Sequence, residues 1–580
     1  MGNGAERGNQ TAGQSALHYI GIDGLPSTIQ CRDHGRLVRV YGDTATMSGR
    51  SELATGTGAA SSLEINVPPA KDPTAAQFRA AGLAAWLFPS LADVLFIVLL
   101  GFILGLRSHQ LLNSDGDLAR HLVVGQQILS TGSIPTVDLF SHTKGGESFV
   151  PYEWLSETLF AMTYQRLGLE GVAVLAAGLA ALPFLLLARW MVRDGINIFL
   201  TLTLVTIGAL AASMHWLARP HLFTTLLALL WARILEDYRR TGRQRYLLLL
   251  PPMMALWANL HGGFLIGFVV LGIYLVGIPL ERGVARRKRA MFLAAAGTAS
   301  LAAVGLNPAG YSVLPHVLSY FQYRFLVDTT QEYLSPNFHG LGPQLFLALV
   351  LLALVSLAAL PKRASITGTL LISVWTFFSC YSARNIPLFV ILTLPTIGLL
   401  ATQALGAAPS PLAKLAGCRS MAERLAATER RMGRALVPAL AVMVALLIAT
   451  GSLGQTRLTV EFDPKVFPIQ ALASLDQVGV QGRMFNYFPW GGYVLYAGYP
   501  KHRVFIDGQT DFYGEELTKD YVKVLSLEPD WEDILARYQI GWVLFPHQSP
   551  LSLMLARTPG WRLAYQDDTA DIFVREGSPQ

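Results

Sequence analysis

The chain has few charged residues and few cysteines. Of its 580 residues, 14% are Asp, Glu, Lys or Arg, whereas 52% are hydrophobic. A soluble domain carries about 25% charged residues, so the composition excludes an ordinary soluble protein and indicates a membrane protein. The three cysteines, Cys31, Cys380 and Cys418, are widely spaced, which excludes a disulfide framework and a cysteine metal cluster.

Two other signals are missing. The net charge of +6 does not indicate a nucleic-acid partner, because the basic residues occur in short clusters between apolar runs. Neither an internal repeat nor a cleavable signal peptide is recognisable. Residues 1–83 are rich in Gly, Ser, Thr and Ala and contain no long apolar run, so we expect a disordered cytoplasmic tail there.

Apolar segments long enough to cross a bilayer recur from residue 84 onward. They predict an α-helical polytopic membrane domain over residues 84–455 with about eleven transmembrane helices, at 84–106, 170–188, 197–213, 219–235, 246–260, 262–280, 290–306, 343–360, 366–382, 386–403 and 435–453. Lys and Arg concentrate in alternate loops, which places the N-terminus in the cytoplasm. The loop over residues 107–169 and the C-terminal region are then extracytoplasmic.

The outer loop over residues 107–169 is acidic, in a chain that is otherwise apolar. Its sequence SDGD predicts a turn followed by a helix over 117–130, which Gly132 ends and Pro135 blocks. A second helix is predicted over 152–167. Asp115 and Asp117 open the first helix, where aspartate often serves only as a cap. Two neighbouring carboxylates can also bind a divalent cation, Mg²⁺ or Mn²⁺, or act as a general base.

Further polar residues fall at the outer ends of the predicted spans. Polar groups at membrane depth are costly and usually line a cavity. We therefore expect one polar cavity, open to the outside and covered by the acidic loop. Arg219 and Arg384 are suited to binding a phosphate, although both can instead anchor their helices at the interface. His221 and His261 are assigned to the same phosphate site, with helix packing as the alternative, and Glu153 is a catalytic candidate that can also simply solvate its helix.

The composition becomes that of a soluble protein from about residue 460. Short β-like runs at 483–486, 503–506, 541–545, 562–566 and 571–575 alternate with helical stretches, which predicts a small extracytoplasmic α/β domain over residues 460–580. In the sequence WGGY, Trp490 and Tyr493 are candidates for binding the acceptor, or form an ordinary aromatic-anchored turn. Asp507 and Asp511 are expected to shape a loop.

The acidic loop resembles a known family. Its pattern D-x-D-x-x-x-H-L, followed by G-x-x-I-L-x-x-G-x-I-P, D-x-F-S-x-T and E-W-L, is similar to the first outer loop of polytopic inverting glycosyltransferases of the GT-C fold. That superfamily includes protein O-mannosyltransferases, aminoarabinose transferases and the catalytic subunit of oligosaccharyltransferases. The matching residues are Asp115, Asp117, His121, Leu122, Gly125, Ile128, Leu129, Gly132, Ile134, Pro135, Asp138, Phe140, Ser141, Thr143, Glu153, Trp154 and Leu155.

The resemblance implies a hexosyl- or pentosyltransferase in a bacterial inner (plasma) membrane. Its donor would be a sugar linked to a polyprenyl phosphate, its acceptor an extracytoplasmic glycan, lipid or protein, and Asp117 best matches the family's outer-loop aspartate. WGGY lies where oligosaccharyltransferases carry WWDxG, but the aspartate is replaced by glycine, so recognition of an asparagine sequon is not implied. A transporter or flippase of lipid-linked sugars and a non-catalytic envelope-assembly protein remain the alternatives.

Overall fold

The computed structural model describes residues 88–281, 286–319, 331–360, 364–407, 416–432, 435–453 and 458–576. These residues belong to one compact unit that spans residues 73–580. The cytoplasmic tail predicted over residues 1–83 lies outside the described residues.

The first part of the described chain is helical. Each of the predicted apolar segments overlaps one of its helices, because long runs of Leu, Ala, Val and Ile satisfy their backbone groups within the helix. The helices are α2 (Leu91–Leu106), α3 (Ser108–Asn113), α4 (Asp117–Thr131), α5 (Trp154–Arg193), α6 (Ile198–Ala212), α7 (His221–Thr241), α8 (Leu250–Leu260), α9 (Leu265–Leu280), α10 (Arg286–Val304), α11 (Val313–Ser319), α13 (Leu341–Ala359), α14 (Ile366–Tyr381), α15 (Ile386–Ala407), α16 (Ala416–Arg431) and α17 (Leu436–Ala449). Short 3₁₀ turns connect several of them: η1 (Ser213–His215), η2 (Gln244–Leu249), η3 (Gly262–Phe264), η4 (Gly310–Ser312), η5 (Gln331–Tyr333) and η6 (Ala383–Asn385).

Five of these helical segments are long and apolar enough to cross a membrane, or six if the bent pair α16 and α17 forms one span. The five are Trp154–Arg193, Ile198–His215, Gly262–Leu280, Leu341–Ala359 and Ala383–Leu405. The protein is therefore a helical membrane protein. The predicted count of eleven spans is not confirmed, because helices such as α2 and α14 are shorter than the bilayer-spanning length.

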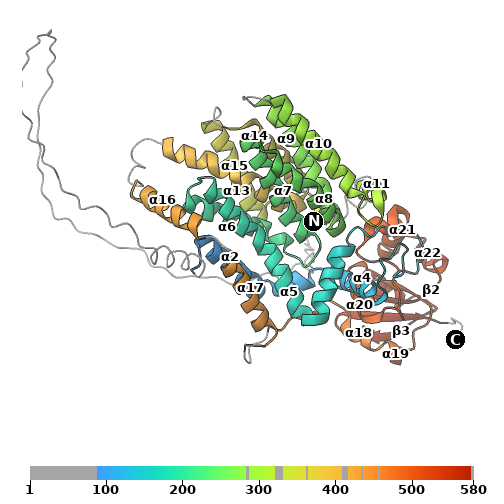
Figure 1. Ribbon diagram of the computed structural model, residues 1–580. Coiled ribbons are helices and arrows are strands. Elements are labelled where there is room, and N and C mark those ends of the chain that lie inside the picture. The colour runs from blue at the N-terminus through green and yellow to red at the C-terminus, as the bar shows by residue number, and fades with distance from the viewer. Residues whose placement is uncertain are drawn as a thin grey trace, which may run out of the picture. The chain divides into compact units, whose positions relative to one another are not determined.

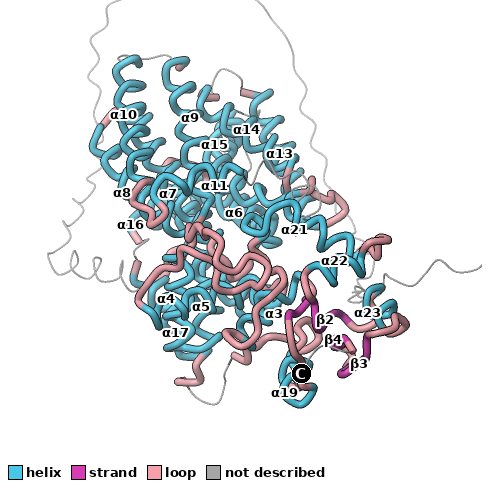
Figure 2. The backbone as a smooth tube through the Cα atoms, turned by 90° about the vertical axis from the view of Figure 1, so that its right-hand side faces the viewer, coloured by secondary structure: helices cyan, strands magenta, loops and turns pink. Residues whose placement is uncertain are grey.

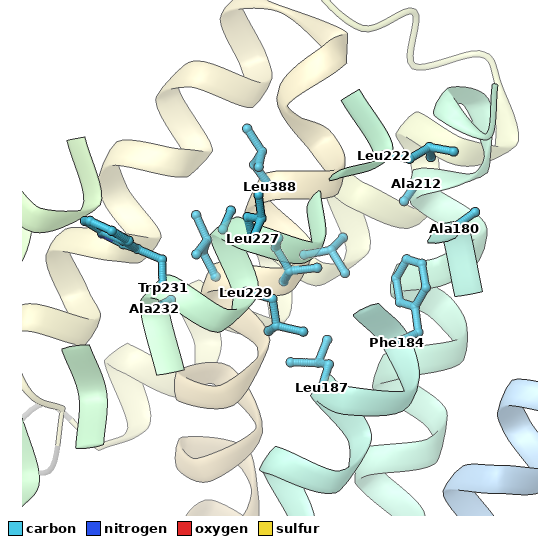
Figure 3. Close-up of a cluster of buried hydrophobic side chains, with 14 of the residues drawn as sticks. Ala180, Phe184, Leu187, Ala212, Leu222, Leu227, Leu229, Trp231, Ala232 and Leu388 are labelled. Atoms are coloured by element: carbon cyan, nitrogen blue, oxygen red, sulfur yellow. The ribbon is translucent and has the colours of Figure 1, made fainter. Parts of the chain in front are cut away.

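The helices pack around an apolar core. Figure 3 shows its centre, where Phe184 and Leu187 of α5 face Leu227 and Leu229 of α7 and Leu388 of α15. All five side chains are at most 6% exposed. Burial of a leucine or phenylalanine contributes about 1.5–3 kcal/mol relative to exposure, so this centre holds α5, α7 and α15 in a fixed arrangement.

The acidic loop contains the two predicted helices. Helix α4 runs from Asp117 to Thr131, and its C-cap, Gly132, adopts a left-handed conformation (φ 66°) and donates its N–H to Ile128 O at 2.9 Å. Glycine favours this conformation because it has no Cβ. The second helix joins the next apolar segment to form the 40-residue helix α5, with a break at Gly168 (φ 67°).

The C-terminal region is an α/β domain with a four-stranded sheet of order β1-β2-β4-β3 (Figure 2). Strand β2 pairs in parallel with β1 and antiparallel with β4, whose Phe573 lies opposite Val543. The elements are α18 (Ile469–Ala473), α19 (Leu475–Val478), β1 (Arg483–Asn486), η8 (Phe488–Trp490), α20 (Gly491–Gly498), α21 (Thr510–Leu525), α22 (Trp531–Arg537), β2 (Ile540–Pro546), α23 (Pro550–Leu555), β3 (Trp561–Gln566) and β4 (Ala570–Arg575).

One predicted strand is not part of this sheet. Within residues 503–506, Val504 instead forms an isolated bridge with Ser141 of the acidic loop. Helix α4 also packs against α20, and Figure 1 shows α4, in light blue, among the orange and red elements of the C-terminal domain. The acidic loop and the C-terminal domain therefore share an interface.

Candidate active site

The turn before α4 uses its two aspartates differently. The Oδ1 atom of Asp115 accepts a hydrogen bond from the backbone N–H of Asp117 at 3.0 Å, which closes the turn. Asp117 is the first helical residue, and the N-cap is Gly116, which has no side chain with which to cap the helix. Capping therefore accounts for part of the role of Asp115, whereas the carboxylate of Asp117 is directed elsewhere.

Arg219 is the centre of the first cluster. Its guanidinium contacts Asp115 Oδ2 and lies 3.2 Å from Asp117 Oδ2 and 2.9 Å from Glu332 Oε1, both measured from Nη1. These residues come from the acidic loop, the segment before α7 and the turn η5. The predicted phosphate-binding arginine therefore forms ion pairs with three carboxylates. No signal in the sequence pointed to Glu332, which lies far from the other members along the chain.

Asp117 and Glu332 in this cluster have shifted pKa values. Burial raises the pKa of Asp117, and the charge of Asp115 raises it further, while Arg219 opposes both. Burial alone would also raise the pKa of Glu332, but Arg219 and Arg384 outweigh it and lower that pKa to about 2. Asp117, with its raised pKa, is therefore the more basic of the two carboxylates.

Arg384 is attached to the same short turn as Arg219. It donates a hydrogen bond to the hydroxyl of Tyr333, and its Cζ atom lies 4.5 Å from the centre of that ring. Because Tyr333 directly follows Glu332, the turn η5 brings together two arginines that are distant in sequence. The two arginines therefore lie beside the same turn, whereas the polar cavity predicted between the outer span ends stays a prediction.

The two predicted histidines, His221 and His261, have hydrogen-bond or ion-pair contacts within the protein. His221 donates from Nε2 to the carbonyl of His215 at 2.8 Å. The Nδ1 atom of His261 accepts from Gly263 N–H at 2.9 Å, so the proton of a neutral His261 is on Nε2, which lies 3.6 Å from Glu153 Oε1. Both side chains therefore have positioning contacts.

His215 falls at the outer end of a predicted span, but no role in the site was assigned to it from the sequence. Its ring is 8% exposed, and its Nε2 atom finds no hydrogen-bond partner among the described residues. A buried ring nitrogen without a partner costs free energy unless something else supplies the hydrogen bond. Its place in the sequence, HWLARPH, four residues before Arg219, was the available signal.

A second cluster lies one helical turn along α4. His121 Nδ1 is 3.2 Å from Glu157 Oε1, and Arg120 Nη1 is 3.6 Å from the same oxygen. Burial raises the pKa of Glu153 to about 8. Burial would lower the pKa of His121, but its hydrogen bond to Glu157 and the charges of the neighbouring acids outweigh burial and raise that pKa.

This second cluster, rather than the predicted aspartate pair, has the composition of a cation site. One ligand atom each of His121, Glu153 and Glu157 lies within 4.8 Å of the others, the one such group found in the described part of the chain. One imidazole and two carboxylates suit Mn²⁺ or Zn²⁺. The predicted metal ligands, Asp115 and Asp117, contact Arg219, and their assignment to a cation stays a prediction.

The WGGY sequence packs inward. Trp490 is 4% exposed and donates from Nε1 to Val466 O at 2.7 Å, and Tyr493 stacks on Phe467 with ring centres 5.1 Å apart. A Cβ on Gly492 would collide with the carbonyl of Gly116. The sequence therefore places the C-terminal domain against the start of α4, and the acceptor-binding role predicted for Trp490 and Tyr493 has no support from their buried positions.

Comparison with known proteins identifies the fold. No protein-family model matches the chain, and no curated protein is recognisably similar to it in sequence. Among solved structures, the oligosaccharyltransferase AglB from Archaeoglobus fulgidus, in complex with an inhibitory peptide and a dolichol-phosphate, matches with a TM-score of 0.51 at 10% identity, over 84% of this chain and 74% of that one.

ArnT from Cupriavidus metallidurans is also similar. Bound to undecaprenyl phosphate it gives a TM-score of 0.43 at 15% identity, covering 87% of this chain and 100% of that one. In its apo state the TM-score is 0.45 at 15% identity, over 84% and 99%. From the match with AglB, the chain has the fold of GT-C glycosyltransferases.

Proposed function

We propose that this protein is a membrane glycosyltransferase that moves a sugar, with inversion, from a polyprenyl-phosphate-linked donor to an extracytoplasmic acceptor. The acceptor is a glycan, a lipid or a protein. The observation that carries the proposal is the convergence of Asp117, Arg219, Glu332 and Arg384, from segments far apart in the sequence, on one partly buried polar site. The shared fold with AglB, an oligosaccharyltransferase seen with a dolichol-phosphate, supports a lipid-linked donor.

Asp117 is assigned as the general base. The acceptor hydroxyl attacks the anomeric carbon, its oxygen forms the new glycosidic bond, and its proton passes to the carboxylate of Asp117. The bond between the anomeric carbon and the phosphate oxygen breaks, and the lipid phosphate leaves with the electron pair. Burial raises the pKa of Asp117, which makes it a stronger base than an exposed aspartate.

Arg384 is assigned to the donor phosphate. Its planar guanidinium is held over Tyr333, and arginine suits phosphate because it can donate two parallel hydrogen bonds. The unpartnered Nε2 atom of His215 is a second group that the phosphate could satisfy. Arg219 contributes its charge nearby and orients Asp117, while His221 and His261 support the walls of the site.

Among the described residues, His121, Glu153 and Glu157 form the group that would hold a divalent cation. Bound there, it would supply positive charge to stabilise the departing phosphate. Arg120 already provides one positive charge beside Glu157, so metal dependence is a separate question from the assignment of the base.

The protein is placed in a bacterial inner membrane with its N-terminus in the cytoplasm and residues 460–580 outside. Membrane vesicles that contain the protein and a labelled polyprenyl phosphate sugar test its function. Transfer of the label to an acceptor supports the enzyme. Movement of the labelled lipid across the bilayer without transfer supports a flippase. If the label is neither transferred nor moved, the result supports a non-catalytic assembly protein.

A further inference from the structure

The C-terminal segment 504–511, VFIDGQTD, is joined to the acidic loop along its whole length. Val504 donates its N–H to Phe140 O at 3.1 Å and accepts from His142 N–H at 3.0 Å. The hydroxyl of Thr143 donates to Phe505 O at 2.7 Å. The predicted strand at 503–506 is therefore bonded to the loop through Val504 and the carbonyl of Phe505, while the side chain of Asn486 accepts from Phe505 N–H at 2.8 Å and donates to Ile506 O at 2.9 Å.

A buried ion pair holds the middle of this segment. Arg120 of α4 is 4% exposed, and its Nε atom donates to Asp507 Oδ2 at 3.2 Å while a terminal nitrogen donates to Gln509. The same guanidinium lies 3.6 Å from Glu157. A buried charge is tolerated when it is paired and hydrogen-bonded, and here the partners come from both halves of the protein. Arg120 therefore fixes the segment against α4.

The far end of the segment is held beside the second cluster. Asp511 Oδ2 accepts from the hydroxyl of Tyr152 at 3.1 Å and lies 2.9 Å from His316 Nε2. Tyr152 directly precedes Glu153. The segment is thus held at residues 504, 507 and 511, and Gly508 lies between these points.

Gly508 faces the carboxylate of Asp117. A Cβ at position 508 would collide with Asp117 Oδ1 and would lie 2.9 Å from its Cγ. The other oxygen, Oδ2, is 3.2 Å from Arg219 Nη1. The carboxylate is therefore enclosed on two sides, by the bare backbone of Gly508 and by the guanidinium of Arg219.

From this geometry, and resting on the proposed function, we infer that Gly508 is a positioning residue for the catalytic base: its missing side chain lets segment 504–511 close on Asp117 and set the carboxylate's orientation. The C-terminal domain is then a wall of the active site. Asp117 is a short side chain at a helix end, so a methyl group at position 508 displaces its carboxylate while the ion pair of Arg120 and Asp507 keeps the domain docked.

The test is the Gly508→Ala variant, with Gly272→Ala as the matched control, because a Cβ at Gly272 in α9 meets no atom within 4 Å. A displacement of about 1 Å in an active site can lower the rate by about 10²-fold. We expect Gly508→Ala to have a kcat about 10²-fold lower than that of the wild type, with little change in KM. Gly272→Ala should transfer sugar at the rate of the wild type, and both variants should have the melting temperature of the wild type.

Two further readouts separate positioning from a general structural defect. Displacement from Arg219 removes the charge that opposes burial, so the rise of activity with pH should move to higher pH in Gly508→Ala. In the Asp117→Asn variant, adding Gly508→Ala should lower the transfer rate little further, because both substitutions act on the carboxylate of residue 117. Additive losses, or an unchanged pH profile, would overturn the inference.

The inference can fail separately from the proposed function. If the wild type transfers no sugar, the proposed function fails, and the position of Asp117 in an experimental structure of Gly508→Ala becomes the test. A carboxylate displaced from Arg219 supports the inference. One that keeps its 3.2 Å contact with Nη1 overturns it.

Discussion

Replacement of Asp117 by asparagine separates catalysis from folding at this site. Asparagine has the size of aspartate and its hydrogen-bonding shape, but it has neither the charge nor the basicity. The backbone N–H of Asp117, which donates to Asp115, is unaffected by the change. Since the Asp117 side chain does not cap α4, the helix start has no reason to unfold.

The magnitudes of the two effects differ widely. Loss of a general base lowers the rate by about 10²–10⁴-fold. The cost in stability is small, because Arg219 keeps its contacts with Asp115 and Glu332 when the 3.2 Å contact with Asp117 is lost. Burial of the ionised Asp117 carboxylate carries a desolvation cost, and a neutral asparagine does not have this cost.

The assay measures initial rates of sugar transfer from a labelled polyprenyl phosphate sugar in vesicles, beside melting curves of the purified protein. Asp115→Asn is the matched control: an asparagine oxygen can still accept from the N–H of residue 117 and close the turn, so its loss of activity should be smaller. Wild-type activity in Asp117→Asn would refute the assignment of the base and remove the main residue-level support for the enzyme.

Three further results are expected. The pKa of Glu153 is about 8 in the folded protein and ordinarily 4.5, so the wild type should lose stability as pH rises from 4.5 to 8. The Glu153→Gln variant should therefore have the melting temperature of the wild type below pH 4.5 and a higher one above pH 8; a constant difference between the two melting temperatures across this range would contradict this. Arg384→Ala should raise the KM for the donor by about tenfold or more, the loss of one charged hydrogen bond, whereas Arg219→Ala should chiefly lower kcat; the reverse pattern would exchange their roles. Reporter fusions at Lys414 and Gln580 should lie on opposite sides of the membrane, and signals from the same side would refute the topology.

Local features of the sequence predicted local structure well. Asp117 to Gly132 forms a helix as expected, because a turn signal precedes it and a left-handed glycine ends it. The strands at 483–486 and 571–575 also appear, with apolar residues buried on both faces of the sheet: Met484 and Ile572 pack in one cluster, and Phe485 and Phe573 pack in another. The number of spans was harder to predict, because an apolar run indicates burial in lipid or in protein alike.

The site depends on contacts that no local pattern encodes. Glu332 reaches Arg219 across more than a hundred residues, and Gly508 meets Asp117 from the other half of the protein. An aromatic residue beside glycines, such as Trp490, has the same sequence whether it faces a ligand or the core. Only the tertiary structure distinguishes these cases.

The charge arrangement explains why an acidic loop exists in an apolar chain. Arg219, at the edge of the helical core, gathers Asp115, Asp117 and Glu332, and Arg120 within the loop gathers Glu157 and Asp507. Each arginine alone would be costly to bury, as would each carboxylate, but within each set the arginine forms ion pairs with its carboxylates.

The two sets differ in how much freedom they leave. Arg120 is enclosed by partners from the loop and the C-terminal domain, and its side chain is 5% exposed, so it is suited to holding structure. Arg219 and Asp117 keep 18% and 25% side-chain exposure, so substrate and solvent protons can reach them. The loop thus carries two ion-pair sets. The enclosed set around Arg120 docks the C-terminal domain, and the accessible set around Arg219 can exchange partners during a reaction. Catalysis is therefore expected at Arg219 and Asp117.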